Sequence, residues 1–202
     1  MNRHIFLVGY RGSGKTSVGR MLAAMLKWPA ADSDDWVEQH IESSIREIFQ
    51  SQGEAGFRAL EIKAIEVLSQ SIQPSVVSLG GGAILREENV HRIRETGWIV
   101  WLKASPDSLH SRILADQTTV DRRPALTNLD GLNEIHDVLA IRSPIYASVA
   151  NVSIDTDNRN TKDIAEEIYS IYQRETSNLN ITSESQPVSS TSTFPKTPKA
   201  KS

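Results

Sequence analysis

The sequence predicts an α/β domain with a parallel β-sheet, and three observations point to this class. Short runs of strand-forming residues alternate with stretches of helical periodicity along most of the chain. A glycine-rich turn directly follows the first of these runs and leads into a helical stretch. The chain of 202 residues, of which 39% are hydrophobic, is large enough for one principal domain with a substantial core.

The glycine-rich turn at residues 9–16 reads GYRGSGKT and matches the phosphate-binding pattern Gly-x-x-x-x-Gly-Lys-Ser/Thr. It lies between a predicted strand over 4–8 and a predicted helix over 18–26, which is the context that this motif requires. Glycines let backbone N–H groups surround a phosphate chain, Lys15 can reach the β- and γ-phosphates, and Thr16 can ligate Mg²⁺. A chance glycine-rich turn is the alternative. Pattern and context together predict a binding site for a nucleoside triphosphate.

The second strand is predicted within 28–35 and ends in acidic residues. Asp32 and Asp34 alternate, so on a strand they would share one face. They would then lie at the carboxyl edge of the sheet, where folds of this class place their ligands. The alternative is that these aspartates cap the following helix.

A long amphipathic helix is predicted over 54–72, after a break at Gly53. Glu54, Arg58 and Glu61 form one stripe on this helix. Their spacing alone favours a solvated helix face with ordinary charge pairs.

Three consecutive glycines, Gly80, Gly81 and Gly82, follow an apolar run over 74–79 that we expect to be a strand. Such a triplet is costly to order because the unfolded glycine backbone is so free. A simple turn and a close approach of a ligand to bare backbone account for it equally well.

The remaining elements follow from periodicity and from cap and turn residues. The polar segment over 116–130 has no clear periodicity, which is typical of a lid or a binding segment. Pro144 is expected to end or kink a helix near Arg142. We expect strands over 98–102 and 151–155, and helices over 35–40, 44–50 (capped by Ser43 or Ser44), 86–95, 105–115 (capped by Ser105), 130–146 and 161–174.

Composition excludes several classes of function. The chain has no cysteine, so it can form no disulfide and has no thiol nucleophile or thiolate metal site. A net charge of -3 argues against a nucleic-acid-binding surface. No apolar run reaches the length of a membrane span, and the first one is too short for a signal peptide, so we expect a cytoplasmic protein. From residue 176 the chain is rich in Ser, Thr, Pro, Asn and Lys, which predicts disorder over 176–202.

The motifs, taken together and in order, resemble the shikimate kinase family of phosphate-loop kinases, which are related to the nucleoside monophosphate kinases. The resemblance covers residues 4–174 and lies in six matching pieces. These are GSGKT at 12–16, DSD at 32–34, GEAGFR at 53–58 with Glu61, GGG at 80–82, RRP at 122–124 and RSPIY at 142–146. Ala125 is a departure, because the family usually has leucine there.

The resemblance implies a three-layer fold with a five-stranded parallel sheet of order 2-3-1-4-5 and helices on both faces. It implies one domain over 1–175, with a lid at about 112–126 and a substrate-binding segment at about 33–61. The implied reaction transfers the γ-phosphoryl group of ATP to the 3-hydroxyl of shikimate, with Mg²⁺, in chorismate and aromatic amino-acid biosynthesis. A monomer is implied as well.

The resemblance also assigns roles to individual residues of this chain. Lys15, Asp34 and Arg123 would be catalytic, with Asp34 holding the reacting hydroxyl and Arg123 reaching the transferred phosphoryl group. Arg58 and Arg142 would bind the carboxylate of shikimate, which suits the planar fork of arginine, and Asp34, Gly80, Gly81 and Gly82 would contact its hydroxyls. ATP would be bound by Gly12, Ser13, Gly14, Lys15, Thr16, Ser17, Arg123 and Arg159. Thr16 would ligate Mg²⁺, and Asp32 would lie just beyond it.

Simpler roles are open to three arginines of the matching pieces, and two further functions compete with the kinase reaction on shikimate. Arg142 could be a surface residue at a helix end, and Arg122 and Arg123 could be solvated loop charges. The chain could phosphorylate a different small acid such as gluconate, or it could be a non-catalytic nucleotide-sensing module. Activity on shikimate against gluconate separates the two kinase reactions, and nucleotide binding without phosphoryl transfer would favour the sensing module.

Overall fold

The computed structural model describes residues 4–116 and 131–184, with 178–184 described by their backbone alone. The chain divides into two compact units, Met1–Tyr169 and Ser170–Ser202. The first unit contains the whole sheet. In the described part of the chain, every helix is too short or too polar to cross a membrane.

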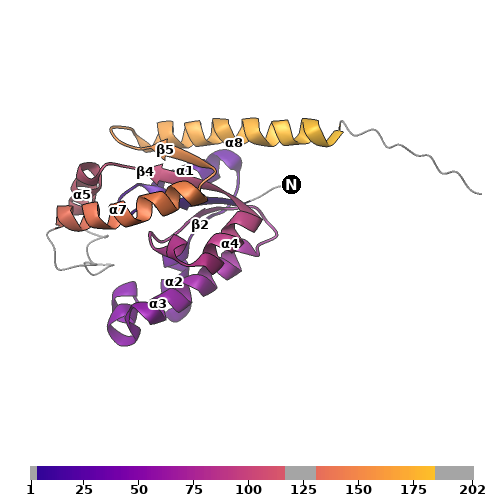
Figure 1. Ribbon diagram of the computed structural model, residues 1–202. Coiled ribbons are helices and arrows are strands. Elements are labelled where there is room, and N and C mark those ends of the chain that lie inside the picture. Colours follow the sequence, from indigo (N-terminus) through magenta and orange to yellow (C-terminus); the bar gives the residue numbers. More distant parts are fainter. Residues whose placement is uncertain (1–3, 117–130, 185–202) are drawn as a thin grey trace, which may run out of the picture. The chain divides into compact units, whose positions relative to one another are not determined.

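Five parallel strands form one sheet (Figure 1). Their order, β2-β3-β1-β4-β5, confirms the predicted order. The central strand β1 is buried along its whole length, as expected of a parallel strand that is covered on both faces. The strands are β1 (His4–Val8), β2 (Ala30–Asp32), β3 (Val76–Ser78), β4 (Gly97–Lys103) and β5 (Val152–Asp155).

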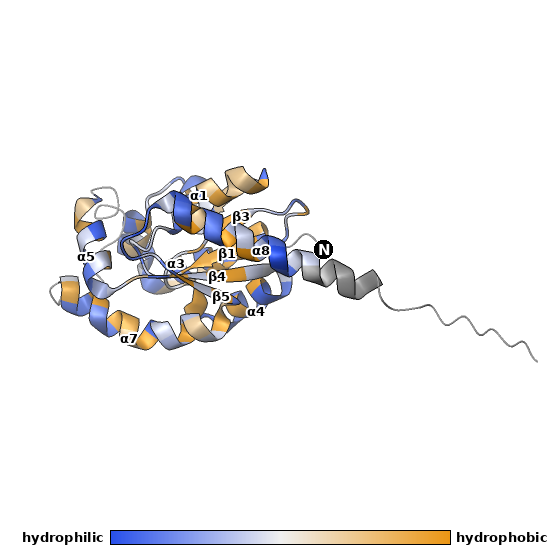
Figure 2. Cartoon of the chain, turned by 90° about the horizontal axis from the view of Figure 1, so that it is seen from above, coloured by the Kyte–Doolittle hydropathy of each residue, from blue (hydrophilic) through white to orange (hydrophobic). Residues whose placement is uncertain are grey.

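Helices cover both faces of the sheet, so the predicted three-layer α/β arrangement is confirmed. In Figure 2 the strands lie between α1 on one side and α4 and α7 on the other. The helices are α1 (Lys15–Leu26), α2 (Ser33–Ile41), α3 (Ile45–Ser69), the short 3₁₀ helix η1 (Ala83–Leu85), α4 (Glu87–Thr96), α5 (Pro106–Ala115), α7 (Gly131–Val149) and α8 (Thr161–Glu184).

The main core cluster joins the sheet to the helices on one of its faces. Phe6 and Val8 of β1 pack there with Ile93 of α4 and with Tyr146 and Val149 of α7. Burying large apolar side chains on this scale contributes about 1.5–3 kcal/mol for each residue. This packing fixes the strand ends that carry the polar residues described below.

The predicted break at Gly53 is confirmed. Gly53 has φ 67° and ψ -174°, a conformation essentially restricted to glycine, and it lies inside the helical span of α3. The start of α3 is also as predicted, because Ser44 accepts a hydrogen bond from Glu47 N while the Glu47 side chain accepts one from Ser44 N.

The prediction that Pro144 ends or kinks its helix near Arg142 is wrong about the end of the helix. Helix α7 continues through Pro144 to Val149. A proline inside a helix lacks one N–H donor and costs about 3 kcal/mol. Tyr146 and Val149, which lie beyond the proline, are both buried in the core, and their packing offsets that cost.

The predicted disorder from residue 176 is wrong for 176–184, because α8 extends to Glu184. Once a helix is nucleated, each further residue adds a hydrogen bond at little cost, and the next proline in the sequence is Pro187. The rest of that predicted tail, 185–202, lies outside the described residues.

Candidate active site

The loop between β1 and α1 has the backbone that its glycines predict. Gly9, Gly12 and Gly14 have positive φ angles of 143°, 79° and 90°. A Cβ on Gly9 would lie 2.5 Å from the carbonyl oxygen of Leu102, so any side chain there would clash with β4. The Lys15 ammonium folds over the loop and donates to Gly9 O and Tyr10 O, at 2.9 Å each.

The carboxyl ends of β2, β3 and β1 lie side by side at one edge of the sheet. Asp32 pairs in register with Ser78, and Ser78 pairs with Leu7. The segments that follow these three strands therefore meet at one place, which is where ligands bind in this class of sheet.

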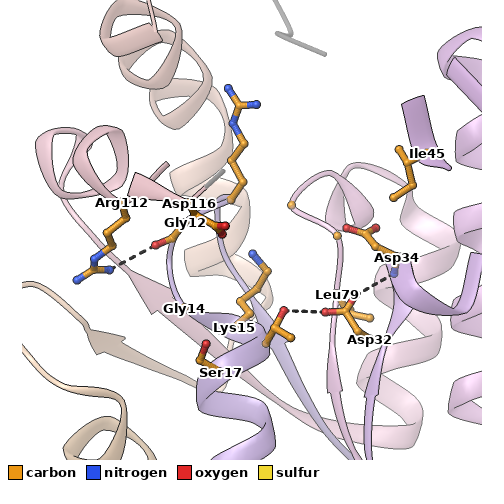
Figure 3. Close-up of a pocket in the computed structure, with 14 residues that line it drawn as sticks. Gly12, Gly14, Lys15, Ser17, Asp32, Asp34, Ile45, Leu79, Arg112 and Asp116 are labelled. Carbon is orange, nitrogen blue, oxygen red and sulfur yellow. Dashed lines mark hydrogen bonds between the residues drawn. The ribbon is translucent and has the colours of Figure 1, made fainter. Parts of the chain in front are cut away.

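A cavity of about 250 Å³ opens at this edge (Figure 3). It brings together nine of the predicted site residues, from three separate segments of the chain. These are Gly12, Gly14, Lys15, Thr16, Ser17, Asp32, Asp34, Gly80 and Gly81. Arg11, Ile45, Leu79, Arg112 and Asp116 complete its lining.

Asp32 and Asp34 do not share a strand face, so that expectation is wrong. Strand β2 ends at Asp32, which caps α2 by accepting a hydrogen bond from Asp34 N at 3.0 Å. The other oxygen of Asp32 accepts from the Thr16 hydroxyl at 2.8 Å. Asp34 belongs to the first turn of α2, and both carboxylates still line the cavity because that turn starts at the sheet edge (Figure 3).

The chemistry of these oxygen atoms suits Mg²⁺. Burial raises the pKa of Asp32, the Asp34 charge raises it further, and the hydrogen bond from Thr16 opposes the rise, so a cation beside Asp32 would relieve the crowding of charge. In the part of the chain that the structure describes, no three His, Cys, Asp or Glu side chains form a metal cluster. A magnesium ion that keeps several waters and binds phosphate oxygens needs only one or two protein ligands. Thr16 and Asp32 fit that pattern.

Arg58 and Glu61 are buried, so the solvated-face interpretation of the stripe on α3 is wrong. Their side chains are 7% and 1% exposed, and Arg58 Nη1 donates to Glu61 Oε2 at 2.9 Å. Arg58 also donates to Glu54 Oε1 through Nη2 at 3.0 Å and through Nε at 3.2 Å. Burial lowers the pKa of Arg58, but Glu61 and Glu54 outweigh it and raise the pKa overall. The guanidinium therefore stays charged inside the fold.

Two glycines of the triplet, Gly81 and Gly82, pack closely against other segments of the chain. A Cβ on Gly82 would lie 2.5 Å from both Nη atoms of Arg58, and a Cβ on Gly81 would lie 3.3 Å from Gly9 O. Gly80 N donates to Ser33 Oγ at 3.0 Å. Other residues of the protein therefore account for part of the close approach to the backbone of the triplet. Gly80 and Gly81 also line the cavity.

Arg142 lies beside the triplet and not at a helix end. It is inside α7, and its Nη1 donates to Gly81 O at 3.2 Å. The hydroxyl of Tyr146, one turn further along α7, donates to the same carbonyl oxygen. The alternative of a surface arginine at a helix terminus is thus wrong.

Five further residues of the sequence analysis do not line this cavity or lie outside the described part of the chain. One is Ser13, which is buried in the loop and is not among the lining residues. Arg159 follows β5 and pairs with Glu167 at 2.6 Å, and it is not among the residues that line the cavity. Arg122, Arg123 and Ala125 lie outside the described residues.

Sequence reasoning missed three residues at this site. Arg112 of α5 lines the cavity and donates to Thr156 O at 2.6 Å, although no motif marks it. Arg11 occupies a position that the loop motif leaves free, and its partner Glu134, at 3.2 Å, looks like any polar residue of an amphipathic helix. Only their positions in space reveal them.

Fold and site together define a kinase of the phosphate-loop class, an enzyme that moves a phosphoryl group from a bound nucleotide to a small molecule. A family model described as shikimate kinase matches residues 11–173. The chain belongs to the shikimate kinase family.

Individual relatives agree with this assignment. The chain is 43% identical to the shikimate kinase of Rhodopirellula baltica over 166 residues, which is 82% of this chain and 88% of the relative. It is 41% identical to that of Symbiobacterium thermophilum over 165 residues, covering 82% of this chain and 93% of the relative.

Solved structures support the fold. The shikimate kinase from Acinetobacter baumannii in complex with shikimate superposes with a TM-score of 0.80 at 32% identity, over 86% of this chain and 94% of that chain. A gluconokinase from Sinorhizobium meliloti gives a TM-score of 0.64 at 20% identity over 90% of this chain and 98% of that chain, which shows a shared fold alone.

Proposed function

We propose that this chain transfers the γ-phosphoryl group of ATP to the 3-hydroxyl of shikimate, giving shikimate 3-phosphate and ADP. One observation carries the proposal: the phosphate-binding loop and Asp34 line the same cavity, and Arg142 lies against the glycine triplet at its wall. The proposal is supported because a phosphate-binding loop, a group that could orient a hydroxyl and a cation that could bind a carboxylate lie close together. The A. baumannii relative, whose structure holds shikimate, supports this choice of acid.

The chain's own residues can perform most of this reaction by positioning and by charge. Backbone N–H groups of the loop and Lys15 bind the phosphates. Asp34 holds the acceptor hydroxyl in line with the terminal phosphorus and takes up its proton late, because the transition state is loose. Arg58 keeps its positive charge through Glu61, as the binding of a carboxylate requires.

Magnesium is part of the proposal. Thr16 and Asp32 would hold it, and when bound it neutralises charge on the phosphate oxygens.

Several finer assignments belong to the same proposal. We assign the acid's carboxylate to Arg58 and Arg142, its hydroxyls to Asp34 and the glycine triplet, and the moving phosphoryl group to Arg123 in a lid over about 112–126. The adenine end of ATP is assigned to Arg159. The domain is taken as 1–175 with a substrate-binding segment over about 33–61, acting as a cytoplasmic monomer.

A coupled assay of ADP release with MgATP tests the function. We expect turnover with shikimate, and we expect Asp34→Asn to lower kcat by about 10²–10⁴-fold, because its amide cannot accept the proton. Asp35→Asn is the matched control, since Asp35 lies in the same helical turn and faces Arg20 at 3.9 Å on the surface. It should leave kcat within about twofold.

The same assay contains the outcomes that would contradict the proposal. Turnover with gluconate but not with shikimate would assign the chain to a different acid. Tight nucleotide binding without ADP release for any acid would indicate a sensing module.

A further inference from the structure

Arg11 and Glu134 form an ion pair at the cavity that the phosphate-loop motif does not require. Arg11 occupies one of the four unconstrained positions of that motif, and its side chain is 17% exposed. Its Nη2 donates to Glu134 Oε1 at 3.2 Å. Glu134, 1% exposed, lies in the first turn of α7. The pair thus connects the catalytic loop with the helix that carries Arg142.

The surroundings of Arg11 hold its side chain in one place. Its Cζ lies 5.8 Å from the centre of the Tyr10 ring. Burial is the main cause that raises the pKa of Tyr10, and the charges of Arg11, Glu134 and Arg142 all act on this phenol, so the three charged groups share one neighbourhood. A long arginine side chain in open solvent would populate many rotamers, and these contacts remove that freedom before any ligand binds.

These contacts do not provide an acceptor for every N–H donor of the Arg11 guanidinium. Arg11 lines the cavity together with Lys15. Its Nε is buried, and no described residue accepts a hydrogen bond from it. A buried donor without an acceptor is unfavourable, and arginine offers its donors in a fixed fork that matches phosphate oxygens. Because Nε itself is buried, a ligand in the cavity would meet the exposed part of the guanidinium, and the terminal phosphate of the nucleotide is the anion at this edge of the loop.

We propose that Arg11 binds the terminal phosphate of the nucleoside triphosphate, and that Glu134 is a positioning residue that orients Arg11 for this contact. The inference rests on the proposed kinase function only for the presence of a nucleotide, and not for the identity of the acid. It deepens that function by assigning the preference for triphosphate over diphosphate to this pair.

Affinities for a non-hydrolysable ATP analogue and for ADP, each with Mg²⁺, test the assignment without any acid substrate. Arg11→Met keeps the apolar stem against Tyr10 and removes the charge. It should weaken binding of the ATP analogue by about tenfold and change ADP binding by less than about twofold. Arg92→Met, at a surface pair of Arg92 with Glu66 at 3.9 Å, is the control and should change neither affinity.

The role of Glu134 is tested by coupling. Glu134→Gln should lower the ATP-to-ADP affinity ratio by about threefold in the wild-type background and should leave the ratio unchanged in the Arg11→Met background. A pair that only fastens the loop to α7 would lower both affinities together, or only the melting temperature, and that result would overturn the inference. The wild-type chain could show no phosphorylation of shikimate while Arg11→Met still loses its preference for the triphosphate. That result would contradict the proposed reaction and leave the role of Arg11 supported.

Discussion

At the scale of single residues, Arg58 shows how a charged side chain becomes part of the interior. Its guanidinium is enclosed between Glu61, Glu54 and the bare backbone of Gly82. Breaking a buried pair by removing one partner leaves an uncompensated charge inside the fold, whereas an exposed pair contributes little. Two ion pairs with the same spacing on α3 allow this difference to be measured.

Glu61→Gln should therefore destabilise the protein by about 3 kcal/mol, because Arg58 keeps only the partly exposed Glu54 as its counter-charge. Glu66→Gln is the matched control on the same helix, since Glu66 pairs with Lys63 on the surface. It should cost less than about 1 kcal/mol. Urea unfolding of both variants gives the comparison, and equal losses would show that burial does not set the contribution of the Arg58 pair.

His4, at the start of β1, is a second residue whose burial has a measurable effect. It is 5% exposed, its Nδ1 accepts from Ser75 N at 3.2 Å, and its Nε2 therefore carries the proton donated to Ser71 O at 3.1 Å. Burial lowers the pKa of His4 from its usual 6.5. The neutral ring is thus the form that the fold accommodates.

As pH falls below about 6.5, the unfolded chain binds a proton at His4 before the folded chain does, so the free energy of unfolding should fall. His4→Leu should remove this part of the pH dependence. Asp32, whose pKa is raised in the folded protein, has the opposite effect on the free energy of unfolding at lower pH. This effect of Asp32 is the same in wild type and in the variant. Chemical unfolding at several values between pH 8 and pH 5 measures the difference; parallel curves for wild type and His4→Leu would contradict the prediction.

At the scale of elements, α3 owes its shape to one glycine. Gly53 adopts φ 67° and ψ -174°, and a Cβ there would meet no atom within 4 Å. Steric contact with the rest of the protein is therefore not the reason for glycine. The backbone conformation itself is, because it lies outside the left-handed helical region that asparagine also tolerates.

Gly53→Ala and Gly53→Asn should both destabilise the protein by about 1–3 kcal/mol, and asparagine should not be milder than alanine. Lys27 provides a contrast, because it is a non-glycine residue in the left-handed helical region, with φ 58° at the end of α1. Lys27→Gly should stabilise by about 0.5 kcal/mol. Melting temperatures of the three variants test this, and a neutral Gly53→Ala would show that α3 can straighten without cost.

At the scale of the whole molecule, the site exists because three strand ends are aligned. The phosphate loop, the start of α2 and the glycine triplet follow β1, β2 and β3, and they lie far apart in the chain. Each segment alone supplies only some of the residues that line the cavity. Ligand binding and folding are therefore linked, since the cavity is present only in the folded chain.

A non-hydrolysable ATP analogue with Mg²⁺ should stabilise the fold by about 2.7 kcal/mol at a concentration one hundred times its Kd. Adding a chelator should reduce this stabilisation, because Thr16 and Asp32 then face the phosphates without a cation. Lys15→Met should lose most of it, since Lys15 lies at the loop that binds the phosphates. A thermal shift series checks these outcomes, and an undiminished shift for Lys15→Met would contradict the placement of the nucleotide.

Local chemistry in the sequence determined the phosphate loop, the parallel sheet, the capping of α3 and the break at Gly53. These features depend on neighbours in the chain, such as glycines with positive φ, a Ser-x-x-Glu cap and alternating apolar runs. The family motifs further predicted Asp34, Gly80 and Arg142 as parts of one site, and the structure brings all three to the same edge of the sheet.

Tertiary structure alone decided the burial of Arg58 with Glu61, the continuation of α7 through Pro144, and the pairing of Arg11 with Glu134. Spacing along a helix shows which residues share a face, but not whether that face meets water or another segment. Burial depends on contacts between residues far apart in the chain. It changes the energy of a charge by several kcal/mol, and packing of buried side chains can offset the cost of a proline inside a helix, which is about 3 kcal/mol. Those contacts form only when the five strands are aligned.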